Sequence, residues 1–308
     1  MSTLTSTARS RAAATDTAPA RAVGPSRRRA ARGWLFLLPL LALNALVIGA
    51  PGLMSVYYSF TDWSGIGPAQ FVGMDNYLRL FSDGAFLQAL LNNLWWTVFF
   101  LLVPISIALA GAFLLSRTTR GQVIYRVVFF VPYTLATIVV ASIWSNIYSP
   151  EYGLTAVLGL DINLLGDPDT ALASVAVANT WQWWGYLMVI FLSAMSSVNP
   201  SLYEAARLDG ASGWQQFVHI TIPGIRPTLV FMALMTVIWS FLVFDYIYIM
   251  TGGGPAGATE VVGTLLYTTA FSTYEAGYAA AMGIVLALIS VVMVGGYLGL
   301  RRWRGWEV

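Results

Sequence analysis

A polar segment between two apolar stretches, residues 201–223 (SLYEAARLDGASGWQQFVHITIP), holds the side chains best suited to contact a molecule outside a membrane. Two carboxylates, Glu204 and Asp209, could make charge contacts with a partner. Small residues around them would let a partner surface approach closely: Ala205, Ala206 and Gly210. Such a surface is suited to docking on another protein. A second interpretation is an interfacial linker in which Trp214 and Phe217 anchor among lipid headgroups, and the residues alone leave both open.

The sequence offers no set of residues for catalysis or metal binding. It has no cysteine, which excludes disulfides and thiolate metal sites, and His219 is its only histidine. The pattern GxxxxGK[ST] is absent, so we expect no cradle for nucleotide phosphates. No nucleophile, base and acid form a plausible set either. We therefore predict no enzyme activity, no cofactor and no metal, with His219 at the surface.

Four polar residues lie within apolar stretches, where polar side chains usually face a cavity or another helix. Asn179, Gln182 and Tyr186 recur at i, i+3 and i+7, which places them on one face of a helix. Ser240 lies in the next apolar stretch. Aromatic residues crowd the first of these stretches: Trp181, Trp183 and Trp184. Polar groups beside aromatic platforms make these four residues candidates for lining a solute path, while hydrogen bonding to a neighbouring helix stays open as an alternative.

The composition predicts that these residues are carried by membrane-spanning helices. Of 308 residues, 57% are apolar and only 10% are charged, too few charges to cover a water-soluble surface. A spanning helix needs roughly 20 apolar residues. We identify six such stretches and predict an all-α, polytopic membrane protein, with a kink or break in the first stretch near Pro39 and Pro51. The stretches are 34–60, 90–115, 124–148, 171–195, 227–250 and 274–300.

Arginine placement predicts the orientation of these helices, because positive residues are retained on the cytoplasmic side. Arginines cluster before the first stretch, between the second and third, in the polar segment and at the C-terminal end: Arg27, Arg28, Arg29, Arg32, Arg117, Arg120, Arg126, Arg207, Arg226, Arg301, Arg302 and Arg304. Only Arg79 falls on the other side, where most acidic residues lie. Both termini are therefore expected in the cytoplasm, with a disordered tail at 1–32 and a short tail at 301–308. Since topology accounts for the arginines, we predict no nucleic-acid partner.

Cap and turn signals predict two short helices within the polar segment. Ser201 and Glu204 fit a capping box, in which their side chains satisfy free amides at a helix start. Gly210 can take the left-handed conformation that ends a helix. A second helix is expected to begin after Gly213 and to run to the break at Pro223. We therefore expect two short helices joined at an angle.

The polar segment resembles the EAA loop of permease subunits in binding-protein-dependent ABC importers. The resemblance rests on Glu204-Ala205-Ala206, then Gly210 after three residues, and Ile220-Thr221-Ile222-Pro223 after nine more. Ile222 replaces the leucine usual in the family, which is an apolar exchange. The segments YYSFTDWSG, FVGMDNYLRLF and TGGGPAGATE resemble the maltose-type sugar permeases, in particular the MalF-like member of the permease pair.

The resemblance implies a type I ABC importer fold, with a permease domain at 33–300 and the coupling loop at 196–226. It implies that Glu204, Ala205, Ala206, Asp209 and Gly210 couple the chain to a cytoplasmic ATPase dimer. The other implied partners are a second permease, an extracytoplasmic substrate-binding protein and membrane lipid. The implied location is the bacterial cytoplasmic membrane.

The implied solute is a sugar or oligosaccharide. An importer for glycerol phosphate, a polyamine or an amino acid is the alternative within the same class. A stand-alone secondary transporter is disfavoured, because the sequence shows no ion pair at the membrane centre and no repeated halves.

Overall fold

A computed structural model describes residues 37–117, 120–160 and 162–303 of the chain. Within these residues every regular element is a helix, as predicted, and the only extended pairing is an isolated bridge between Thr61 and Phe71. The chain divides into two compact units, 1–52 and 53–308. The predicted tail at 1–32 and the last residues, 304–308, lie outside the described part, so the domain boundaries at 33 and 300 stay predictions.

The first predicted span is a helix from Leu37 to Tyr58, long and apolar enough to cross a membrane. It changes to a wider π turn, η1 (Ala45–Gly49), directly before α2 (Ala50–Tyr58). Pro51 is the second residue of α2 and cannot donate a backbone hydrogen bond. The helix is not broken at either proline, and the π turn is a local irregularity directly before Pro51.

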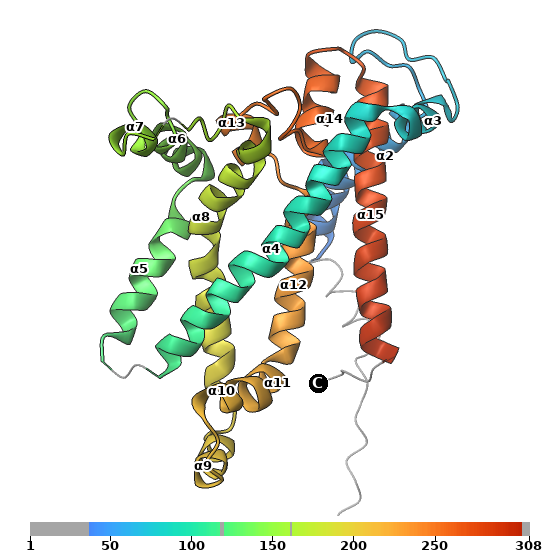
Figure 1. Cartoon of the computed structure of the whole chain (residues 1–308). Coiled ribbons are helices and arrows are strands. Elements are labelled where there is room, and N and C mark those ends of the chain that lie inside the picture. The colour runs from blue at the N-terminus through green and yellow to red at the C-terminus, as the bar shows by residue number, and fades with distance from the viewer. Residues whose placement is uncertain (1–36, 118–119, 161, 304–308) are drawn as a thin grey trace, which may run out of the picture. The chain divides into compact units, whose positions relative to one another are not determined.

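The second unit contains a bundle of apolar helices with short helices at both of its ends (Figure 1). Its elements are α3 (Asp75–Ser82), α4 (Gly84–Ser116), α5 (Gln122–Thr134), α6 (Thr137–Ile147), α7 (Leu154–Val157), α8 (Pro168–Ser196), α9 (Pro200–Leu208), α10 (Gly213–Gln216), η2 (Phe217–Thr221), α11 (Ile222–Gly224), α12 (Arg226–Phe241), α13 (Asp245–Met250), α14 (Val262–Phe271) and α15 (Ala276–Trp303).

Two of the predicted spans are broken, which corrects the prediction of one helix for each. The stretch 124–148 forms α5 and α6, which meet at 94°. Pro132 removes one donor near the end of α5, and Leu135 and Ala136 turn to extended backbone. The stretch 227–250 forms α12, which ends at Phe241, and the separate helix α13. The described residues thus hold three long apolar helices, and up to six spans when each bent pair counts as one.

The interface between α4 and α8 forms the main core of the second unit. Ala108 and Ala112 of α4 are fully buried together with Leu187, Met188 and Phe191 of α8. Small residues on one helix leave room for large ones on the other, the usual way in which membrane helices approach closely. Both helices are thereby fixed along their length, and they carry the loop and polar residues described below.

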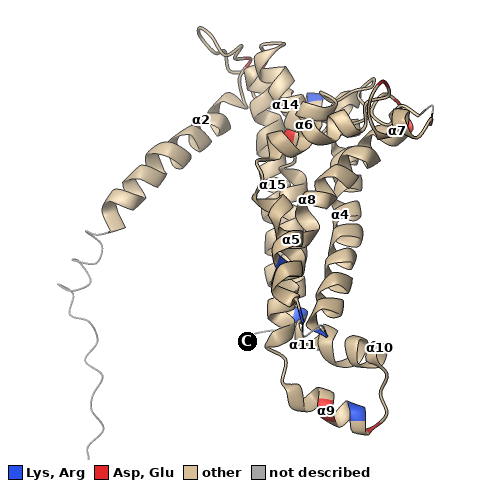
Figure 2. Cartoon of the chain, turned by 90° about the vertical axis from the view of Figure 1, so that its left-hand side faces the viewer, with Lys and Arg blue, Asp and Glu red and all other residues tan. Residues whose placement is uncertain are grey.

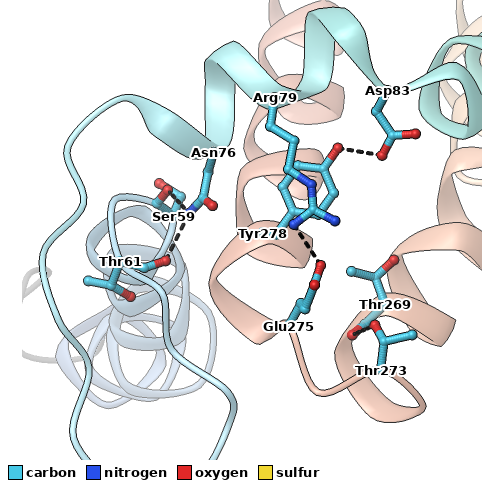
Figure 3. A network of polar contacts seen from close by, with 9 residues as sticks. All are labelled: Ser59, Thr61, Asn76, Arg79, Asp83, Thr269, Thr273, Glu275 and Tyr278. Carbon is cyan, nitrogen blue, oxygen red and sulfur yellow. Dashed lines mark hydrogen bonds and ion pairs between the residues drawn. The ribbon is translucent and has the colours of Figure 1, made fainter.

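A polar network at the opposite end from α9 ties α3 to α15 and to the segment after α2 (Figure 3). Arg79 forms an ion pair with Glu275 at 2.8 Å, and the Tyr278 hydroxyl donates to Asp83 at 2.6 Å. The Asn76 amide donates to the carbonyls of Ser59 and Thr61. Partial burial opposes ionisation of Asp83, but the bonds from Tyr278 and from two backbone amides outweigh it and hold the pKa of Asp83 below its ordinary value.

Candidate functional site

The predicted loop forms a helical hairpin between α8 and α12 (Figure 1). Its first arm is α9, which turns away from α8 by 75°. Its second arm is the continuous helical run of α10, η2 and α11, which meets α12 at 72°. This is the predicted pair of short helices joined at an angle, and we call it the hairpin from here on. Along the chain, α9 is joined to α8 directly and to α12 through the second arm.

The start of α9 differs from the prediction. Asn199 is its cap, with Oδ1 accepting from the Ser201 amide at 3.0 Å, and Pro200 is the first helical residue. Because proline has a helical φ and needs no acceptor there, the helix begins before Ser201. The predicted capping box of Ser201 and Glu204 is therefore wrong, and the Glu204 side chain is exposed.

A capping box does form at the start of the second arm. The Ser212 amide donates to Gln215 Oε1 at 2.6 Å, and the Gln215 amide donates to Ser212 Oγ at 3.3 Å. These two bonds satisfy free amides at the start of α10. The second arm therefore has its own anchored start.

The end of α9 follows the predicted pattern. Gly210 has φ +77°, in the left-handed region where a side chain would be strained. Its amide donates to the Arg207 carbonyl at 3.1 Å, and the Ala211 amide donates to the Ala206 carbonyl at 2.8 Å. This pair of bonds is the Schellman motif, which satisfies the last carbonyls of a helix. The first arm is thus closed at both ends.

The outer surface of α9 combines acidic and apolar groups. Four of the five predicted coupling residues, Glu204, Ala205, Asp209 and Gly210, are exposed, and Ala206 is half-buried. The exposed Leu208, with 90% of its surface accessible, was missed because a helix-forming leucine signals nothing by itself. Exposed apolar area beside charged groups is typical of a protein-binding surface.

Of the two aromatic residues in the interfacial-linker interpretation, only Trp214 is placed where it could anchor in a membrane interface. Trp214 is exposed, but Phe217 is buried against Phe113 of α4, with ring centroids 4.5 Å apart. Phe217 therefore holds the hairpin to the bundle, and its expected anchoring among headgroups is wrong. His219 is exposed, as predicted, with Nδ1 3.0 Å from the Gln215 carbonyl oxygen.

A cavity of about 360 Å³ lies where α8, α12 and α13 meet, and two of the four solute-path candidates line it. Asn179 reaches it from α8, and Ser240 from α12. The Ser240 hydroxyl also donates to the Thr236 carbonyl at 2.8 Å. Aromatic rings form much of the wall: Trp96, Phe100, Tyr133, Trp183, Trp239, Phe244 and Tyr246. The size falls within the roughly 300–1,000 Å³ typical of small-molecule sites.

Gln182 and Tyr186 lie outside the lining of this cavity. Gln182 is buried, and its Nε2 donates to the Leu135 carbonyl at 2.8 Å, in the break between α5 and α6. Its Oε1 accepts from the Tyr246 hydroxyl at 2.6 Å. Tyr186 stacks on Tyr133, with ring centroids 4.4 Å apart. Gln182 thus makes the helix-to-helix bonds of the alternative interpretation, and solute contact by either residue stays a prediction.

Sequence reasoning missed Thr137 and Thr236 as polar lining of the cavity. Asp245 also lines the cavity. It reaches the cavity because α12 stops at Phe241 and α13 starts with Asp245 itself. No local pattern marks a threonine or aspartate as cavity-lining when its helix has an unrecognised break.

Charges are distributed unevenly between the two ends of the second unit. Figure 2 shows most of the basic residues toward the end with α9, α10 and α11, and acidic residues around α7 at the other end. The hairpin therefore lies at the basic end.

In the loop before α14, burial raises the pKa of Glu260, and a hydrogen bond from Thr264 only partly offsets this rise.

Comparison with known proteins places the chain in a family. Residues 101–304 match the family described as the binding-protein-dependent transport system inner membrane component. The probable ABC transporter permease protein YurN of Bacillus subtilis is 36% identical over 274 residues, covering 84% of this chain and 92% of that protein. The trehalose/maltose transport system permease protein MalF of Thermococcus litoralis is 31% identical, covering 90% of this chain and 96% of that protein.

A solved structure has the same fold. One chain of a bacterial alginate ABC transporter, in complex with an alginate pentasaccharide-bound periplasmic protein, superimposes with a TM-score of 0.79 at 24% identity. The match covers 89% of this chain and 95% of that chain. The fold is thus that of an ABC importer permease. Together with the matched residues and relatives, this shows that the chain belongs to the family of inner membrane components of binding-protein-dependent transport systems.

Proposed function

We propose that this permease carries a sugar or oligosaccharide, and that α9 docks on a separate ATPase to couple hydrolysis to transport. The observation that carries the proposal is the position of the hairpin. It joins α8 and α12, and these two helices supply Asn179 and Ser240 to the cavity. A displacement of α9 would therefore move two walls of the candidate solute site.

The construction of the hairpin suits it to transmit force. A joint between subunits must be rigid, and α9 is capped by Asn199 and closed at Gly210. Docking shifts the balance between inward-open and outward-open states only if the ATPase contacts the permease differently in its own open and closed states. The exposed Glu204, Leu208 and Asp209 supply charge and apolar area for such contacts.

The cavity lining supports a carbohydrate as the solute. Trp183 and Trp239 meet edge to face, with ring centroids 4.5 Å apart, and Asn179 and Asp245 lie in the same lining. Aromatic surface with a few placed polar groups is the usual composition of small-molecule sites, and it suits a ring with an apolar face and hydroxyl edges. Relatives named for trehalose and maltose support the same class. Glycerol phosphate, a polyamine or an amino acid is the alternative.

The assembly that we propose contains this chain, a second permease, an ATPase dimer and an extracytoplasmic binding protein. The basic end with the hairpin would face the cytoplasm, together with both termini, because arginines are retained there. The acidic end around α7 would then face the binding protein. The solved alginate transporter, which includes a periplasmic protein, supports this arrangement by its fold.

The test is a reconstituted transporter. The chain is co-expressed with a candidate ATPase, second permease and binding protein, and the binding protein is first screened against sugars, glycerol phosphate, polyamines and amino acids. We expect a sugar to bind, and that sugar to stimulate ATP hydrolysis and uptake in proteoliposomes. Binding of only a non-sugar would overturn the solute assignment, and uptake without any ATPase would overturn the importer assignment.

A further inference from the structure

A second cavity, of about 350 Å³, lies between the hairpin and the ends of the long helices. Three arginines from three elements line it: Arg117 follows α4, Arg126 lies in α5, and Arg207 lies in α9. Gln122 and Tyr203 add further polar groups to the wall. The cavity is separate from the solute site, since the two share no lining residue.

The positive charge of this cavity has no acidic counterpart in its wall. No aspartate or glutamate lines it among the residues that the structure describes. The ion pair between Arg79 and Glu275 lies in the network at the far end of the unit, away from this cavity. Glu204 and Asp209 neighbour Arg207 in sequence, but both are exposed and outside the lining.

One of the three arginines has a buried guanidinium nitrogen that lacks a hydrogen-bond partner. Arg126 Nε is buried and has no hydrogen-bond partner. Arg117 Nη2 donates to the Gly213 carbonyl at 3.2 Å, and its guanidinium lies 4.3 Å from the centre of the Phe113 ring. Arg117 is exposed, so the cost of burying a charged group without an anion falls on Arg126, and a bound anion would offset it. The arrangement calls for a bound anion.

We propose that this cavity binds the phosphate of an anionic phospholipid. Guanidinium forks match phosphate oxygens in two-pronged geometry, and basic pockets between membrane helices typically take anionic headgroups. The adjoining surface of α5 favours a lipid as the source of the phosphate. Val123, Ile124 and Val127 are 69%, 67% and 56% exposed, and they follow directly after Gln122 of the cavity wall. Acyl chains can lie along this face while the headgroup enters between the arginines.

The bound phosphate would join the hairpin to the bundle. Arg207 belongs to α9, whereas Arg117 follows the end of α4 and Arg126 lies in the first turns of α5. An anion held by all three would brace α9 against α4 and α5. This inference stands apart from the proposed transport function, because lipid retention can be measured without uptake.

The test uses the full chain purified with its associated subunits. Complexes are reconstituted into nanodiscs of phosphatidylcholine, with or without phosphatidylglycerol, and retained lipid is counted by native mass spectrometry after release. The variants are Arg126→Gln and Arg117→Gln. Arg120→Gln is the matched control, since it removes the same charge from an exposed position outside the lining. Arg126→Lys keeps the positive charge but loses the planar guanidinium, which can donate two parallel hydrogen bonds to a phosphate.

We expect phosphatidylglycerol retention to fall roughly tenfold in Arg126→Gln and Arg117→Gln, to fall less in Arg126→Lys, and to be unchanged in Arg120→Gln. A parallel arm measures stabilisation by inorganic phosphate in phosphatidylcholine alone. Stabilisation that needs Arg126 but no anionic lipid would overturn the lipid source in favour of a free anion. Equal lipid retention in all variants, with no effect of phosphate, would overturn the site itself, and would leave a carboxylate from the docked ATPase as the counter-charge.

Discussion

The Tyr203 hydroxyl lies 2.9 Å from Thr221 Oγ1 and so links the two arms of the hairpin. Tyr203 comes from α9, and Thr221 ends η2, eighteen residues further along the chain. Phe217, four residues before Thr221, packs on Phe113 of α4. A path of direct contacts therefore runs from the exposed arm through the buried arm into the bundle, as a force-transmitting element requires.

Removing this link should weaken coupling while leaving assembly intact. Tyr203→Phe and Thr221→Val each break the hydrogen bond, and a typical bond of this kind contributes about 0.5–1.5 kcal/mol. We expect each variant to transport less solute per ATP hydrolysed, measured as the ratio of uptake to hydrolysis in proteoliposomes. Thr221→Val also removes the bond from Thr221 Oγ1 to the Gln216 carbonyl, so the double variant should lose no more than Thr221→Val alone. Additive losses would show that the two side chains act separately.

Changes on α9 itself should have larger effects. Gly210→Pro cannot keep φ +77° and should deform the end of the arm, while Glu204→Ala removes an exposed carboxylate. We expect uptake to be lost or the ATPase to dissociate, with membrane insertion unaffected. Pull-down of the ATPase and uptake are measured together. Glu151→Ala, an exposed acid outside the hairpin, is the control. Normal uptake in both hairpin variants would remove α9 from the coupling path.

Substitutions of Asn179 and of Gln182 should cause different kinds of defect. Asn179→Leu replaces a polar side chain of the cavity wall with an apolar one, so we expect weaker solute-stimulated transport with normal assembly. Gln182→Leu leaves the Leu135 carbonyl and the Tyr246 hydroxyl without partners, at a cost of about 1–3 kcal/mol for each buried group. That variant should unfold at a lower temperature in detergent. An unchanged solute dependence in Asn179→Leu would assign Asn179 to helix packing.

Gly185 should tolerate no side chain, because α8 meets the backbone of α5 there. A methyl group at this position would collide with the Phe129 carbonyl. We expect Gly185→Ala to lower the unfolding temperature of the purified chain. Gly295→Ala in α15 is the matched control, since nothing lies within 4 Å and alanine favours a helix by roughly 0.5–1 kcal/mol. Equal unfolding temperatures in the two variants would mean that α5 and α8 are more loosely packed than the structure indicates.

Local sequence signals predicted much of the fold and failed where distant contacts decide the outcome. Apolar length was sufficient for α4, α8 and α15, and the glycine signal located the end of α9 at Gly210. The break after α5 depends on a carbonyl, that of Leu135, which bonds to Gln182 forty-seven residues away. No window of local sequence contains that partner.

The candidate site likewise has a part that local sequence predicts and a part that it does not. The motif placed Glu204, Ala205, Asp209 and Gly210 on an exposed arm, because cap and turn chemistry is local. Helical spacing put Asn179, Gln182 and Tyr186 on one face of α8, but it could not tell which part of that face meets a cavity. The residue that lines the cavity is distinguished from the one that bonds to other helices only by tertiary packing. Gln182 bonds to Leu135 directly after α5 and to Tyr246 of α13.

The central claim is that α9 contacts an ATPase, and cross-linking tests it most directly. The chain has no cysteine, so Ala205→Cys on α9 and Val157→Cys in α7 each introduce a single thiol at an exposed position. Each is labelled with a thiol-reactive photo-cross-linker in the assembled complex. We expect Ala205→Cys to capture the ATPase, with an efficiency that changes when ATP is added, and Val157→Cys not to capture it. Capture from position 157, or none from position 205 in an intact complex, would contradict the central claim.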